Sequence, residues 1–94
     1  MLGKLRSGTA NLTGAGTAQA IVTTSTVASG LVFRARDGNT GNLYVGDSTI
    51  DNTGPPITPG TAIGFSDKSE FDLADIYFDG GTTNDDLDFW YMVP

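Results

Sequence analysis

The sequence of 94 residues contains neither cysteine nor histidine. Without cysteine, the chain has no disulfides and no thiolate ligands for a metal ion. Without histidine, it lacks the commonest general base and the commonest metal ligand. A serine nucleophile would need a lysine as its base, and neither Lys4 nor Lys68 lies in a suggestive motif. We therefore predict a protein that is not an enzyme and that carries no cofactor.

Basic residues are few. Five Lys and Arg stand against eleven Asp and Glu, which gives a net charge of -6 and an isoelectric point near 4.1. Nucleic-acid binding requires clustered cations that neutralise phosphates, so we predict no nucleic-acid partner. Most acidic residues lie in the C-terminal third, and such runs are typically solvated loops.

Long apolar runs are absent as well. No stretch approaches the ~20 apolar residues of a transmembrane helix, and no apolar run of signal-peptide length follows the basic N-terminus. We therefore predict no membrane partner and a chain that is made in the cytoplasm and kept soluble. A single domain of this length buries only about two thirds of its unfolded surface, so we expect its stability to be shared with a partner or with further copies.

Short alternating segments separated by turn residues make up most of the chain. Leu31, Phe33 and Ala35 fall on one face of a strand predicted over residues 31–36. Residues 37–41 are turn formers, which predicts a hairpin with a return strand over residues 42–45. Further strands are predicted over residues 18–23, 62–66, 76–78 and 87–93, with a 3₁₀ turn or corner capped by Ser69 over residues 69–75. The pattern predicts an all-β fold, a small antiparallel β-sandwich of jelly-roll or other Greek-key type.

The first sixteen residues are rich in Gly, Thr and Ala and keep no periodicity for long. They are typical of an extended arm or an edge strand, and terminal disorder is the alternative. We divide the chain into an N-terminal arm, residues 1–16, and a β-sandwich domain, residues 17–94. We expect the arm to become ordered only on a partner or within an oligomer, so that its deletion leaves a folded domain.

The last predicted strand carries bulky side chains on both faces. Leu87, Phe89, Tyr91 and Val93 share one face, and Asp88, Trp90 and Met92 share the other. A strand of this kind commonly packs one face on the core and the other on a further subunit. Cover by a loop or by the N-terminal arm is an equal alternative.

Two sets of polar or aromatic residues are candidates for binding. Residues 47–52 offer oxygen ligands but lack the glycine and the acidic last residue of an EF-hand loop. The acidic side chains of the turn over residues 79–88 would bind calcium only if they gathered, and we predict no metal site; they are Asp79, Asp85, Asp86 and Asp88. Four aromatic residues would form a sugar-stacking platform if they shared a face, but core or interface positions are commoner; they are Tyr44, Tyr77, Trp90 and Tyr91.

Five segments together resemble a pattern found in short virion proteins of tailed bacteriophages. They are AQAI at residues 18–21, LVFRA at 31–35, NLYVG at 42–46, ITPG at 57–60 and DLADIYF at 72–78. Each segment is weakly specific, and the resemblance rests on their order and spacing over about residues 18–92.

The resemblance implies a β-sandwich that decorates or cements the capsid, commonly as a homotrimer. The implied partner is the major capsid protein, and the implied location is the capsid surface of the virion after synthesis in the host cytoplasm. On this interpretation the N-terminal arm binds the capsid through Lys4, Leu5 and Arg6, and an oligomer interface includes Trp90 and Met92. The alternative is a carbohydrate-binding or receptor-binding module of a tail or fibre.

Overall fold

The computed structural model describes residues 3–65 and 70–93 of the chain. The strands are β1 (Lys4–Asn11), β2 (Gln19–Ala20), β3 (Val27–Ala35), β4 (Leu43–Gly46), β5 (Ala62–Phe65), β6 (Phe71–Asp72), β7 (Tyr77–Gly80) and β8 (Asp86–Val93). The 3₁₀ helix η1 (Leu73–Asp75) lies between β6 and β7. The predicted all-β fold is confirmed, and so is a 3₁₀ turn within residues 69–75. The N-cap of η1 is Asp72, and the predicted cap Ser69 lies outside the described residues.

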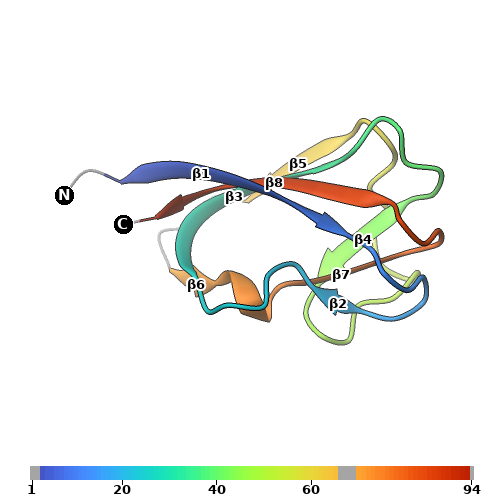
Figure 1. The fold of residues 1–94 in the computed structure, drawn as a ribbon, viewed down its shortest axis with the longest axis horizontal. Helices are drawn as coiled ribbons and strands as arrows, with labels where there is room; N and C mark the ends of the chain where they lie inside the picture. Colours follow the sequence, from blue (N-terminus) through green and yellow to red (C-terminus); the bar gives the residue numbers. More distant parts are fainter. Residues whose placement is uncertain (1–2, 66–69, 94) are drawn as a thin grey trace.

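The strands form two antiparallel sheets (Figure 1). The larger sheet has the order β1-β8-β3-β5, with β6 paired to the start of β3, and the smaller sheet has the order β2-β7-β4. The molecule measures 40 × 24 × 20 Å. The larger sheet extends past the smaller one toward the end where both termini lie (Figure 1).

One apolar core lies between the sheets. The larger sheet contributes the inward rows of β3 and β8, which follow the predicted alternation, and the smaller sheet with its connections covers them. The buried apolar residues are Ala10, Leu12, Ile21, Ala28, Leu31, Phe33, Ala35, Leu43, Ile57, Leu73, Phe78, Leu87 and Phe89.

Two glycines are required in the larger sheet, one where an aromatic ring packs against the backbone and one where a strand bends. Gly8 on β1 lies against Phe89, and a Cβ atom there would be 2.6 Å from Cζ of the ring. Gly30 has a φ of 75° and lies where the β3 register shifts between Ser29 and Leu31. This bulge lets β3 bend, so that its first residues pair with β6 and not with β8.

The predicted hairpin between residues 31–36 and 42–45 is wrong. β3 pairs with β5, β6 and β8, whereas β4 pairs with β7 in the other sheet. The turn residues 37–41 therefore cross from one sheet to the other. Asn39 explains the difference, because its side-chain amide both donates to the carbonyl of Asp86 at 2.8 Å and accepts from its N–H at 2.8 Å.

The N-terminal segment is an edge strand of the larger sheet. All eight residues of β1 have partners on β8, from Lys4 opposite Val93 to Asn11 opposite Asp86. Ala10 at the end of β1 and Leu12 just after it are buried. Residues 4–11 thus form the edge strand that the sequence offered as one interpretation of this segment.

This pairing predicts that deletion of residues 1–11 abolishes cooperative unfolding. The deletion removes the whole of β1 and exposes the edge of β8 together with the Phe89 ring. Circular dichroism melting is the measurement, and deletion of residues 1–3 alone is the control, which should melt within a few degrees of the full chain. A deletion of residues 1–11 that melts cooperatively at the full-length temperature would contradict the assignment of β1 to the domain.

Candidate interaction surface

The outer face of the larger sheet divides into a polar half and an apolar half. Thr9, Asp88 and Arg34 lie side by side in one row across β1, β8 and β3. The next outward row along the sheet contains Ser7, Trp90 and Val32, and beyond it Leu5 lies opposite Met92. Alternation of side chains along each strand places all of them on the solvent side.

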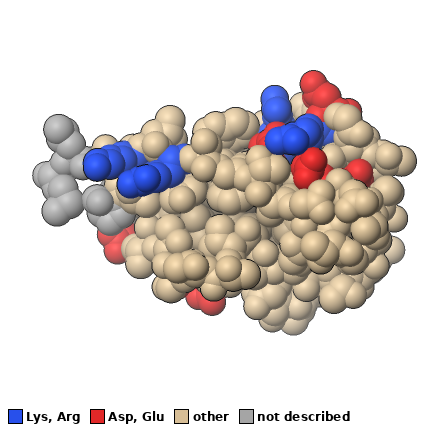
Figure 2. Space-filling view, in the orientation of Figure 1, with Lys and Arg blue, Asp and Glu red and all other residues tan. Residues whose placement is uncertain are grey.

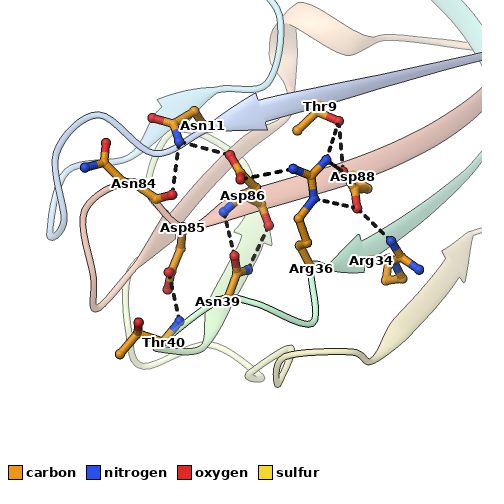
Figure 3. Close-up of polar contacts among 10 residues, drawn as sticks. All are labelled: Thr9, Asn11, Arg34, Arg36, Asn39, Thr40, Asn84, Asp85, Asp86 and Asp88. Carbon is orange, nitrogen blue, oxygen red and sulfur yellow. Dashed lines mark hydrogen bonds and ion pairs between the residues drawn. The ribbon is translucent and has the colours of Figure 1, made fainter.

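Asp88 is the centre of the polar half (Figure 3). Asp88 is only 6% exposed. It accepts hydrogen bonds from Thr9 Oγ1 at 2.8 Å, from Arg34 Nη2 at 3.0 Å and from Arg36 Nη2 at 2.8 Å. Burial alone would raise the pKa of Asp88, but the hydrogen bonds from Arg36, Thr9 and Arg34, together with the Arg36 charge, outweigh burial and lower it. The hydrogen bond to Asp88 and its charge correspondingly raise the pKa of Arg36.

Asp86 extends this network to the end of the strands. Its carboxylate accepts from Arg36 Nη1 at 3.3 Å and from Asn11 Nδ2 at 2.9 Å. Side-chain hydrogen bonds thereby join the end of β1, the start of β8 and the residue after β3, in addition to the backbone pairing. Sequence reasoning did not single out Thr9, Arg34 or Arg36; the available signal was the alternation of polar side chains along predicted strands.

Two of the carboxylates that had been considered for calcium binding, those of Asp85 and Asp79, are bound to backbone N–H groups in different connections. Asp85 accepts from the N–H groups of Thr40 and Gly41, both at 2.9 Å (Figure 3 shows the first). Asp79 accepts from the N–H groups of Gly16 at 3.0 Å and Gly80 at 2.7 Å. Within the described residues, no group of three or more acidic side chains is arranged to hold a metal ion.

The acidic C-terminal third is therefore not simply a set of solvated loops. Asp79, Asp85 and Asp88 are buried, and their charges are satisfied by backbone N–H groups, hydroxyls and guanidinium groups. This corrects the prediction from charge composition, which counts acidic residues but does not reveal their hydrogen-bond partners.

Asp47 and Asp51 form two consecutive Asx turns in the segment that had been considered as a calcium loop. Each carboxylate accepts from the hydroxyl and the N–H of the threonine two residues later, Thr49 and Thr53 respectively. The hydroxyl bond, followed by the backbone bond, lowers the pKa of each carboxyl group. Both aspartates thus stabilise turns.

The apolar half contains an exposed surface that we call the outer patch: Leu5, Val32, Trp90 and Met92. Leu5 is 68% exposed, Val32 40% and Met92 38%. Trp90 is partly buried, and the Arg34 guanidinium carbon lies 5.9 Å from its ring centroid, within cation–π range. The patch therefore borders directly on the polar network.

The outer patch contains residues from both the predicted capsid-binding arm and the predicted oligomer interface. Leu5 was predicted to bind the capsid, and Met92, with Trp90, to lie in an oligomer interface, yet Leu5 and Met92 are cross-strand neighbours. Lys4 and Arg6 alternate with Leu5 and so lie on the opposite face of β1, in the rows of Val93 and Tyr91. The structure brings Leu5, Trp90 and Met92 together and separates them from the two cations.

The four candidate platform aromatics do not share a face. Trp90 is on the outer face of the larger sheet, whereas Tyr91 packs against the core and stacks on Phe89 at 5.9 Å. Tyr44 and Tyr77 lie in the smaller sheet, on β4 and β7. The sugar-stacking platform considered from the sequence is therefore not assembled.

Comparison of the chain with protein-family models, with curated proteins and with solved structures finds no match. Among the described residues, no helix has the length and apolar character needed to cross a membrane.

The Asp88 network predicts a specific loss of stability in acid. Because folding lowers the Asp88 pKa, its contribution is complete above the unfolded pKa of about 3.9 and is lost as the pH falls through the folded value. Asp88→Asn should lower the free energy of unfolding at pH 7 by about 2 kcal/mol and flatten its decline below pH 5. Urea unfolding from pH 2 to 7 measures both effects. The control Asp37→Asn changes an exposed loop residue, and equal behaviour of the two variants would refute the assignment.

Proposed function

We propose that this chain is a non-enzymatic structural protein of a tailed-phage virion, a decoration or cement subunit that binds the major capsid protein at the capsid surface. The observation that carries the proposal is the outer patch on the larger sheet. Four apolar or amphipathic side chains converge there on neighbouring strands. The resemblance of the five sequence segments supplies the class of partner.

The composition of the outer patch suits a protein interface. Trp and Met are enriched at the centres of interfaces, which are typically bordered by polar groups. Here Trp90 and Met92 lie beside Leu5, and the Arg34, Arg36 and Asp88 network borders them. Ion pairs and hydrogen bonds already order these polar side chains, so binding would cost little side-chain entropy.

The outer patch contains three of the five residues for which the resemblance implies a binding role. Leu5, Trp90 and Met92 form one capsid-binding surface, joined by Val32. Further copies on the same capsid would add avidity. Lys4 and Arg6 lie on the other face of β1 and are not part of this surface.

The alternative function, carbohydrate or receptor binding by a tail or fibre module, has less support. Trp90 is the only aromatic residue of the outer patch, and Arg34 lies over its ring. A flat apolar patch beside an ordered ion-pair network suits a protein partner better than a sugar.

Binding to heads tests the proposal. Heads are assembled from the phage genome that encodes this chain, with its coding sequence deleted, and the purified chain is added back. We expect saturable binding, measured as copies per head on quantitative gels. Leu5→Ser combined with Met92→Ser should weaken binding at least tenfold, about 1.4 kcal/mol, because it removes exposed apolar contact without altering the core.

The matched control is Pro56→Ser, which changes an exposed apolar position on the connection between β4 and β5. It should bind as the unchanged chain does. The proposal fails if heads do not bind the chain, or if the double variant binds equally well. A saturable change of Trp90 fluorescence on titration with host glycans would instead favour the alternative function.

A further inference from the structure

One flank of the sandwich is open and apolar. β5 ends the larger sheet and β4 ends the smaller one, and between them lies a cavity of about 370 Å³. Its apolar side chains come from both sheets and from β6: Leu31, Phe33, Val45, Phe65, Phe71 and Ile76. Phe65 on β5 is 52% exposed although its ring packs edge-on against Phe33 at 5.9 Å. We call this region, with the free edge of β5, the open flank.

The chain has few apolar residues left to cover the open flank. The four residues that follow Phe65 in the sequence are Ser66, Asp67, Lys68 and Ser69, none of them apolar. The opposite flank is different, because the chain passes there from β1 to β2 and buries Leu12 completely. The described residues thus leave this apolar flank exposed.

We propose that β1 of a second copy pairs with β5 and covers the open flank. The topology supports this occupant, since β1 and β5 are the two edge strands of the same sheet. Each neighbouring pair in the order β1-β8-β3-β5 is antiparallel, so β1 and β5 run in opposite directions. A copy related by rotation about an axis along the strands would present β1 antiparallel to β5, as a further strand of the sheet.

The register of the sheet indicates which residues meet. Arg6, Tyr91, Leu31 and Phe65 lie in one row across the sheet. If the second copy continues these rows, its residues 6–9 face β5 residues 65–62 in reverse order. Its Gly8 then lies beside Ile63 without a steric clash. Its Arg6 lies on the inward side beside Phe65, where the side-chain stem covers the cavity and the guanidinium reaches its rim.

Charge also favours this pairing. Lys4 and Arg6 are exposed on β1, and Figure 2 shows a basic surface at the end of the molecule where β1 begins in Figure 1. Two residues that line the cavity, Phe71 and Ile76, are directly preceded in the sequence by acidic residues, Glu70 and Asp75, and both acidic residues are exposed. The ion pairs among the described residues join Arg34 and Arg36 to Asp86 and Asp88. The charges on β1 and beside the cavity take no part in these ion pairs. Pairing of β1 with a second β1 would leave the cavity uncovered.

A contact between two different surfaces is heterologous, and it forms either a closed ring or an open chain. A trimer would be the smallest ring. This self-association does not depend on the capsid role, since it uses the free edge and the inward side of β1, whereas Leu5 of the outer patch lies on the outward side.

Charge reversal tests the contact in the full-length chain. Sedimentation velocity at 0.15 M salt should show a concentration-dependent assembly of three or more copies. Arg6→Glu should weaken it at least tenfold, and so should Glu70→Arg, because each places like charges together. The double variant Arg6→Glu with Glu70→Arg should recover association. Mixing the two single variants should also recover association in an open chain or an even-numbered ring, where alternating copies have opposite charges at each contact. In a trimer, mixing should recover two of the three contacts.

Two controls separate the contact from general charge effects. Asp37→Arg makes the same charge change as Glu70→Arg in an exposed loop. Thr17→Glu with Thr24→Glu makes the same change as Arg6→Glu at exposed positions outside the flank. Both should associate normally, and circular dichroism should show that every variant is folded.

The inference is overturned by a monomer at all concentrations, by a two-fold dimer, or by an assembly that the reversals leave unchanged. A monomer that binds the apolar dye anilinonaphthalene sulfonate would identify the cavity as a small-ligand site and would also overturn it. Binding to heads is scored separately, so a monomer that binds heads would refute this contact alone. An assembly that ignores heads would refute only the capsid role.

Discussion

Hydrogen bonds from backbone N–H groups to buried carboxylates hold the connections of this sandwich in place. Asp85 binds the crossing between β3 and β4, and Asp79 binds the connection between β1 and β2. Asp72 accepts from the N–H groups of Thr26 and Ala74 and from the Ser25 hydroxyl, and so fixes the start of β3 beside η1. Except for the bond from Ala74, each of these bonds joins segments that are far apart in the sequence. In this cysteine-free chain, these hydrogen bonds link distant segments, as disulfides do in many small domains.

The same kind of hydrogen bonding divides the outer face of the larger sheet into a polar and an apolar half. Asp88 and Asp86 order the cations of the outer face at one end of the larger sheet, and those side chains are consequently committed to structure. At the other end of the same face, the described residues form no comparable network, and the apolar side chains of Leu5, Val32 and Met92 are exposed there. The division follows from the positions of the two aspartates on β8, which place both carboxylates at the end of the strand nearest the loops.

Local patterns in the sequence predicted the strands but not their partners. Alternation identified β3 and the two faces of β8, because side-chain period is a property of each strand by itself. The Asp-Gly-Asn turn was predicted to close a hairpin, yet Asn39 instead joins the backbone of Asp86, 47 residues away. The same limit applies to the candidate surface: Leu5 and Met92 were predicted as parts of two different surfaces, and only the pairing of β1 with β8 makes them neighbours.

The difference in size between the two sheets explains why apolar side chains at the flank of this small domain remain exposed. The larger sheet, with four strands in series, cannot be covered by a three-stranded sheet that has only two or four residues in each strand. Phe65 is therefore left half in contact with Phe33 and half in solvent. Closing the flank within one chain would require a further strand beside β5. In every copy, β1 is an edge strand at the other side of the same sheet and runs antiparallel to β5. A short chain can thus complete its core by assembly, because the strand that it lacks on one side is present on the other side of its neighbour.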